Sequence, residues 1–258
     1  MFGFIRSLRR RRLAKRALPP AWAQLIDERL AFASSMAPEQ RERFITHLKV
    51  FAWEKAWVGV EGIVITDEIK VVVSGAAARL ARNLPLDVYN DLGTIIIHPG
   101  HLQKTGDGVI LGMAHRLGAV SLSWDSVKRG IANAQDGHDV ALHELAHAID
   151  VADGDFDGTP PLEVMADRHA WAAACGAAFG RLRAAARHDV MRAYGATNEA
   201  EFFAVATEVF FEKPRQLAKK EPVLYAALAK FYGFDPTKSS RPSRGAARSP
   251  AATQREER

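Results

Sequence analysis

The sequence predicts an α+β protein, a single helix-rich domain that also holds a small β-sheet. Most of the chain between residues 21 and 231 repeats apolar residues at helical spacing, whereas two short β-rich runs both lie before residue 125. The 258 residues are 48% hydrophobic, which is enough for a sizeable core. No run approaches the ~18 uninterrupted apolar residues of a spanning helix, so the sequence does not predict an integral membrane protein.

The first elements are helices. One is predicted at residues 21–34 and a second at 38–57, because Phe44, Leu48 and Phe51 share one stripe of the latter. Thr66, followed by two acidic residues, is typical of a helix start. The β-branched run at 71–73 leaves a strand open as the alternative there.

Strands and further helices follow in turn. Residues 93–98 are β-rich and end before a Pro-Gly turn, and residues 119–124 alternate as a strand with one buried face does. Such a strand could lie at a sheet edge and pair with an extended peptide. Helical periodicity then predicts four more helices, at about 138–151, 162–188, 199–212 (ended by Pro214) and 221–231.

Basic residues concentrate at the two ends of the chain. Residues 1–17 carry seven basic residues and no acidic one, and residues 238–258 carry six basic and two acidic ones, which leaves a net charge of −6 on residues 18–237. We therefore expect a solvated basic N-terminal arm (1–17), a folded domain (18–237) and a disordered basic tail (238–258). The arm could make weak contact with an acidic membrane surface. An acidic body is not expected to bind nucleic acid.

The compartment is predicted from what the sequence lacks. Cys175 is the one cysteine, so no disulfide can form within the chain, and no continuous apolar run follows the basic N-terminus as it would in a secretory signal. We expect a cytoplasmic protein.

Residues 143–147, His-Glu-Leu-Ala-His, carry the chemistry. On a helix, His143 and His147 are one turn apart on one face and can bind the same metal ion, whereas Glu144 lies ~100° around the axis and can reach a water on that ion. Apolar residues surround the motif, so the helix is expected to be buried. Two buried histidines and a glutamate are costly without a metal or other partners. This is the zincin arrangement, which binds one Zn²⁺ per chain.

A third ligand is required, and two glutamates compete for the position. Glu163 lies 16 residues beyond the motif and could instead be a first-turn acid at a helix start. Glu201 could instead complete a capping box with Asn198. Spacing alone leaves both open.

Ligand histidines usually donate their other N–H to a carboxylate. Asp150, Asp153 and Glu208 are candidates, and Glu208 is favoured because it shares a helix face with Glu201.

Several segments together resemble the MtfA family of zinc peptidases, the Mlc titration factor group. They are ITDEIKV at 65–71, SLSWDSV at 121–127, DGHDVALHELAHAIDVADG at 136–154, the tyrosine in RAYGATN at 192–198, and EFFAVATEVFFEKP at 201–214. The resemblance implies a gluzincin with a catalytic core similar to that of anthrax lethal factor.

In that family pattern Glu201 is the third ligand and Tyr194 points at the substrate carbonyl, while Glu144 is the general base. The resemblance also implies a cytosolic peptidase with aminopeptidase activity on small substrates. At least one member of the family binds the transcriptional repressor Mlc. A regulatory protein that sequesters a repressor, with hydrolysis secondary, is therefore the alternative function.

Overall fold

The computed structural model describes residues 2–100, 118–162, 164–185 and 190–238. The N-terminal half contains α1 (Phe2–Lys15), α2 (Pro20–Arg29), η1 (Ala31–Ser35), α3 (Pro38–Glu54), β1 (Ala56–Gly59), α4 (Asp67–Leu80), η2 (Leu86–Tyr89), β2 (Thr94–His98) and β3 (Ala119–Ser123). The C-terminal half contains α6 (Trp124–Ala132), α7 (Val140–Asp150), η3 (Val151–Asp153), α8 (Met165–Ala184), η4 (Ala193–Ala196), α9 (Glu199–Glu212), α10 (Pro214–Lys220) and α11 (Pro222–Phe231). Helices dominate and one small sheet is present, so the predicted α+β class is confirmed.

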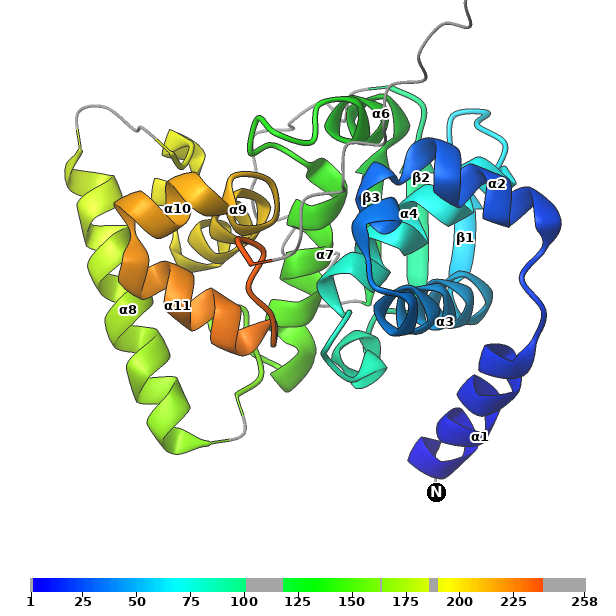
Figure 1. Cartoon of the computed structure of the whole chain (residues 1–258), viewed down its shortest axis with the longest axis horizontal. Helices are drawn as coiled ribbons and strands as arrows, with labels where there is room; N and C mark the ends of the chain where they lie inside the picture. The colour runs from blue at the N-terminus through cyan, green and yellow to red at the C-terminus, as the bar shows by residue number, and fades with distance from the viewer. Residues whose placement is uncertain (1, 101–117, 163, 186–189, 239–258) are drawn as a thin grey trace, which may run out of the picture.

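The sheet has three parallel strands in the order β1-β2-β3. Ile95 and Ile97 of the central strand are fully buried, which explains why that run is β-branched without polar alternation. Within the described residues, β3 pairs with β2 alone and so lies at an edge. The helix α7 contacts β3, α4 and α9, and Figure 1 shows it between the sheet region and the C-terminal helices.

The helix α4 separates two hydrophobic clusters. Val72 and Val73 face the main core around α7 and α9, whereas Val71 faces a second cluster built with α2 and α3. The Thr66 hydroxyl accepts a hydrogen bond from the Ile69 N–H at 3.3 Å and so caps the helix. The strand alternative at 71–73 is therefore wrong: a helix buried on two faces also needs apolar residues nearly all round.

Apart from α1 and the short 3₁₀ turns, three elements were not predicted, each for a local reason. The strand β1 overlaps the end of the second predicted helix at residues 56–57, because its four mostly exposed residues show no alternation. The helix α6 begins directly after β3, where the Ser123 hydroxyl accepts from the Ser126 N–H at 3.2 Å. Pro214 ends α9 as expected but also starts α10, because proline suits the first turn of a helix.

The N-terminal segment is a helix that contacts α3, and five of its seven basic residues are exposed. The Arg10 guanidinium bonds both oxygens of Glu54, at 2.6 and 2.9 Å, and the carboxylate of Asp87 at 2.6 Å. The Lys49 ammonium donates to the carbonyls of Ala14 and Arg16, both at 2.7 Å. Glu54 and Asp87 thus pair with one of the basic residues near the start of the chain, Arg10.

One face of α1 still points away from the protein. Phe4, Ile5 and Leu8 are 70%, 58% and 40% exposed, and Arg11 and Arg12 are exposed beside them. The expected contact with acidic membranes stays a prediction for this face, and vesicle sedimentation at low and high salt would test it. Among the described residues, every helix falls short of the length and apolar character needed to cross a bilayer. Residues 239–258, nearly all of the predicted tail, lie outside the described residues.

The loop between η3 and α8 passes tightly beneath the start of α9. Gly158 has φ +80°, and a Cβ there would lie 2.3 Å from the Glu199 carbonyl oxygen. Its own N–H donates to Asp150 at 3.1 Å, and its carbonyl accepts from the Trp171 indole at 3.1 Å. A glycine is required here both by the backbone conformation and by the closeness of α9.

Gly158→Ala is therefore expected to destabilise the fold by ~1–3 kcal/mol, because the added methyl group displaces the start of α9 and strains the backbone. Gly176→Ala is the matched control: Gly176 lies within α8, and a Cβ added there would have nothing within 4 Å, so alanine should be neutral or stabilise by up to ~1 kcal/mol. Urea unfolding of both variants measures the difference. Equal stability of the two variants would contradict the tight contact at Gly158.

Candidate metal centre

The sequence around α7 determines where its histidines point. The Asp139 side chain accepts hydrogen bonds from the N–H groups of Ala141 and Leu142, at 2.9 and 3.1 Å, and so fixes the first turn. His143 and His147 are buried, as are the apolar residues that hold the helix in the core: Leu142, Leu145, Ala146 and Ile149. The two imidazoles thus project together from one face into the contact with α9.

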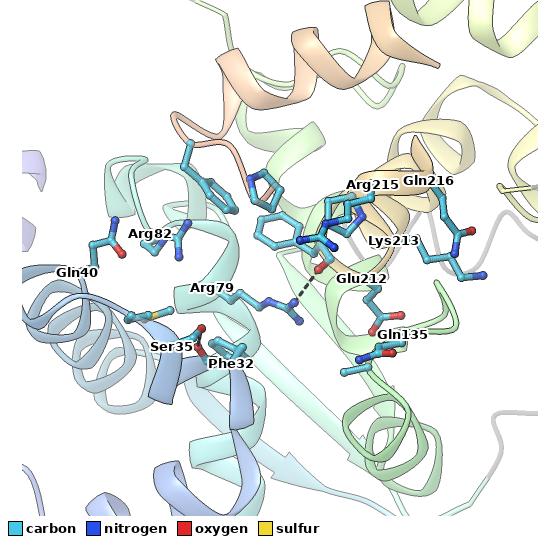
Figure 2. Close-up of a pocket in the computed structure, with 16 residues that line it drawn as sticks. Phe32, Ser35, Gln40, Arg79, Arg82, Gln135, Glu212, Lys213, Arg215 and Gln216 are labelled. Carbon is cyan, nitrogen blue, oxygen red and sulfur yellow. Dashed lines mark hydrogen bonds between the residues drawn. The ribbon is translucent and has the colours of Figure 1, made fainter. Parts of the chain in front are cut away.

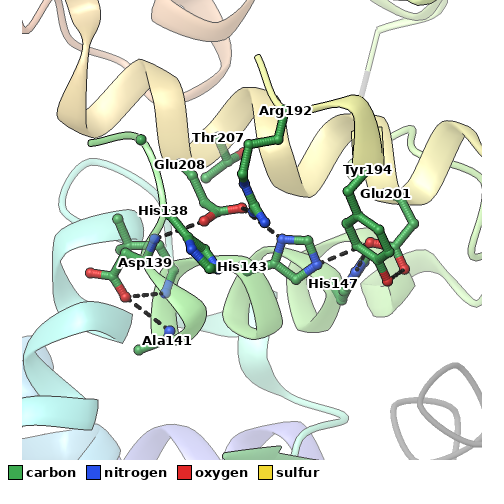
Figure 3. Close-up of polar contacts among 12 residues, drawn as sticks. His138, Asp139, Ala141, His143, His147, Arg192, Tyr194, Glu201, Thr207 and Glu208 are labelled. Atoms are coloured by element: carbon green, nitrogen blue, oxygen red, sulfur yellow. Dashed lines mark hydrogen bonds and ion pairs between the residues drawn. The ribbon is translucent and has the colours of Figure 1, made fainter. Parts of the chain in front are cut away.

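Glu201 meets both imidazoles. Its Oε2 lies 3.0 Å from His143 Nε2 and 3.4 Å from His147 Nε2 (Figure 3). One ligand atom from each of the three residues lies within 4.8 Å of the others. The Asn198 side chain caps α9 by accepting from the Glu201 N–H at 2.8 Å, so capping and presentation of the carboxylate are compatible. Two buried imidazole nitrogens and one partly buried carboxylate oxygen fit a zinc ion.

The pKa values of His143, His147 and Glu201 are shifted because the three groups are close together and shielded from solvent. Burial lowers the pKa of His143, but hydrogen bonds with Glu201 and Glu208 outweigh it and raise the pKa to about 10. Burial lowers the pKa of His147. Burial raises the pKa of Glu201, yet the hydrogen bonds with both imidazoles hold it well below its usual range. Ligand histidines must be neutral, so loading a metal here releases a proton.

Behind the histidines, Glu208 of α9 is fully buried. Its Oε1 accepts from His143 Nδ1 at 2.8 Å, and its Oε2 accepts from the Asp139 N–H at 2.7 Å. Arg192 forms an ion pair with the same carboxylate. Glu208 therefore holds both the ring of His143 and the first turn of α7, as expected of the carboxylate behind a ligand histidine.

Tyr194 lies beside this cluster, in the short η4 turn. Its hydroxyl donates to Glu201 Oε1 at 2.9 Å, and its ring centroid is 5.9 Å from that of His143. Burial, together with the negative charge of Glu201, raises the pKa of Tyr194 well above its usual range. The hydroxyl thus keeps its proton and can act as a hydrogen-bond donor.

The structure brings most of the predicted site residues together. His143, His147, Glu201, Tyr194 and Glu208 form one cluster. Glu144 is buried on the neighbouring face of α7. The competing ligand Glu163 lies outside the described residues.

Two of the carboxylates proposed to support a histidine have other contacts. Asp150 accepts from Gly158 in the loop below α9, and Asp153 is 3.8 Å from Arg168.

Sequence reasoning missed two supporting residues. Asp139 could have been found, because an acidic residue just before a helix start is a cap signal. Arg192 has no such signal: it lies 16 residues from Glu208 in the chain, and the RAYGATN segment that it begins was used only for its tyrosine.

Comparison with known proteins finds a family model and several similar chains. A family model described as glucose-regulated metallo-peptidase M90 matches residues 5–233. An uncharacterized protein of Synechocystis sp. is 33% identical over 244 residues, covering 88% of this chain and 89% of its own length. Mlc titration factor A of Serratia proteamaculans is 26% identical, covering 79% and 83%. Mlc titration factor A of Yersinia pestis is 24% identical, covering 77% and 79%.

Asp150, at the end of α7, predicts a pH dependence of stability. It is fully buried, its Oδ1 has no hydrogen-bond partner, and burial raises its pKa to about 7. The stability gained from the neutral carboxyl is complete below the unfolded pKa of ~4 and is lost as the pH rises through about 7. Asp150→Asn stays neutral and should exceed the wild type at pH 8 by roughly 1–3 kcal/mol, with a smaller gain at pH 5.

The measurement is urea unfolding of both proteins, in EDTA, at pH 5 and pH 8. An Asn variant whose stability differs from the wild type equally at both pH values would contradict the raised pKa.

Proposed function

Because the chain belongs to the M90 family of glucose-regulated metallopeptidases, the family of the Mlc titration factor A proteins, we propose that it is a zinc-dependent peptidase. The observation that carries this proposal is the convergence of His143, His147 and Glu201. These three residues would hold the ion. When bound, zinc supplies Lewis-acid chemistry: it polarises the scissile carbonyl and lowers the pKa of water.

The remaining steps belong to the residues around the metal. Glu144 accepts the proton of the attacking water and then donates it to the leaving amine. Tyr194, a protonated donor next to Glu201, stabilises the negative charge that develops on the carbonyl oxygen. Glu208 holds the His143 ring and is itself held by Arg192. These contacts keep the reacting groups in place without further rearrangement.

The edge strand β3 offers a place for the substrate. It contacts α7, and β2 is its one sheet partner among the residues described. An extended peptide can pair with such an edge through its backbone while side chains fill adjacent pockets. We infer that the substrate is a peptide. The preference for its amino-terminal bond rests on the resemblance to the MtfA family, and cleavage of a peptide library would test it.

Zinc content and turnover together test the ligand assignment. His143→Ala, His147→Ala and Glu201→Gln should each lose stoichiometric zinc and activity, because each variant loses one of three donors. Tyr194→Phe should keep its zinc while kcat falls ~10²–10³-fold, because it loses only an oxyanion donor. Glu163→Gln is the control and should keep both. Metal analysis and peptide hydrolysis of the variants side by side provide the readout, and zinc retained by Glu201→Gln but lost by Glu163→Gln would overturn the proposal.

Repressor binding is a second candidate function, and the name of two relatives favours it. In this alternative the folded surface sequesters a transcriptional repressor of the Mlc type, and hydrolysis is secondary. The two functions can be distinguished with a variant that removes only the chemistry.

Glu144→Gln is that variant. It keeps the shape and the proposed ligands but lacks the general base, so peptide hydrolysis should fall by at least ~10²-fold. If the chain also binds a repressor, co-purification with a repressor of the Mlc type should be as strong for Glu144→Gln as for the wild type. Full hydrolysis by the variant would exclude Glu144 as the base, and an absence of binding by both proteins would exclude the repressor function.

A further inference from the structure

A separate cavity lies at the far end of α9 from the metal centre. It has a volume of about 470 Å³ and is lined by residues of η1, α3, α4, α9 and α10 and of the segments after α4, α6 and α11 (Figure 2). Glu212 lines it, and Glu212 is eleven residues from Glu201, or ~16 Å along the helix axis. The proposed metal ligands are absent from the described residues that line this cavity, so it is a distinct site.

Arg82 is the unusual residue of this cavity. It is 8% exposed, and its Nε has no hydrogen-bond partner. The guanidinium stacks on the ring of Phe234, 3.7 Å from the ring centroid. Stacking fixes the plane of the guanidinium but leaves the N–H groups at its edge free to donate. A buried N–H group without an acceptor is costly, and an anion that accepts from Arg82 Nε in the cavity would remove that cost.

Arg79 gives the cavity a second guanidinium from the same region of the chain. It lies between the rings of Phe32 and Phe211, 4.6 and 5.3 Å from their centroids, and donates to the Phe211 carbonyl at 2.9 Å. Its charge is offset by nearby Asp139 and by Glu212. Arg79 is thus already held by the protein, and it shapes the cavity rather than supplying the unmet charge.

The other charged residues of the lining increase the positive charge. Lys213 and Arg215 line the cavity together with Arg82, whereas Glu212 is the one carboxylate among the described residues of the lining. Burial raises the pKa of Glu212 to about 7, so near neutral pH it is about half ionised and offsets only part of the charge of these cations. Polar uncharged groups also line the cavity: Ser35, Gln40, Gln135 and Gln216. An occupant therefore needs more than one negative charge and groups that can hydrogen-bond to amides and a hydroxyl.

We propose that this cavity binds a small organic phosphate, with its phosphate group against Arg82 and within the positive charge that Lys213 and Arg215 add to the lining. A phosphate monoester carries close to two negative charges near neutral pH and accepts hydrogen bonds on three oxygens, which matches a fork-shaped guanidinium and neighbouring cations. A monocarboxylate would neutralise only part of the charge. The three aromatic rings and the amides leave room for a polar organic group of a few carbon atoms.

Calorimetric titration of the full chain with glycerol 3-phosphate tests this site without using peptidase activity. The wild type should show saturable binding of one equivalent. Arg82→Gln should weaken binding at least tenfold, and so should Arg215→Gln, which changes an exposed side chain and is not expected to disturb folding. Lys219→Gln is the matched control: it removes the same charge from the same helix, α10, at an exposed position outside the cavity. Its affinity should equal that of the wild type.

Three outcomes would overturn the proposal. One is an absence of saturation at 10 mM ligand in the wild type. Another is an equal loss of affinity in Lys219→Gln and Arg215→Gln, which would indicate attraction to the general positive charge of α10. The third is equally tight binding of acetate, which would show that the cavity does not require a phosphate group.

Discussion

The helix α7 buries two imidazoles, of His143 and His147, and the carboxylate of Glu144. The surrounding elements are arranged so that buried polar groups have partners. Buried polar groups are tolerated only when hydrogen-bonded or bound to a metal. The helix α9 meets that need with Glu201 in front of His143 and His147, and with Glu208 behind His143. The aromatic residues of α9 contribute to the packing, because Phe202, Phe203 and Phe210 are fully or almost fully buried and hold the helix at a fixed distance from α7. The apolar core and the polar cluster are thus built from alternate faces of the same two helices.

Further contacts at both ends of α7 hold it against α9. Arg192 neutralises the buried carboxylate of Glu208, and Asp139 links that carboxylate to the start of α7. At the other end of α7, Asp150 ties the helix to the loop at Gly158, which in turn lies against the start of α9. Each of the two helices is therefore positioned at both ends by contacts that also involve its partner. Such mutual positioning gives a ligand set little freedom to drift apart before a metal binds.

A site residue could be predicted where the residues that indicate its role lie close to it in the chain. His143, Glu144 and His147 follow from five consecutive residues, and the buried character of α7 follows from the apolar residues around them. Glu201 could be separated from Glu163 only by resemblance, since both glutamates are plausible first-turn residues. Arg192 could not be found, because an ion pair between distant segments leaves no periodic pattern. For the same reason the helix α1 was missed: its partners Glu54 and Asp87 are 44 and 77 residues away from Arg10. The helices α6 and α10 were not predicted because each starts where another element ends, and not because of their composition.

The helix α9 carries three acidic residues that reach toward α7 and the loop before it. Glu201 meets the histidines, Glu208 meets His143 and Asp139, and Glu212 accepts from the N–H groups of Gly137 and His138 at 2.8 and 3.0 Å. Their spacing of seven and four residues keeps them on one face. One inserted residue would rotate every later side chain by ~100° about the helix axis and remove all later contacts at once. Evolution can therefore vary the bulk of side chains along residues 201–212 but not the number of residues, and changes in length among related chains should accumulate in the connections between helices instead.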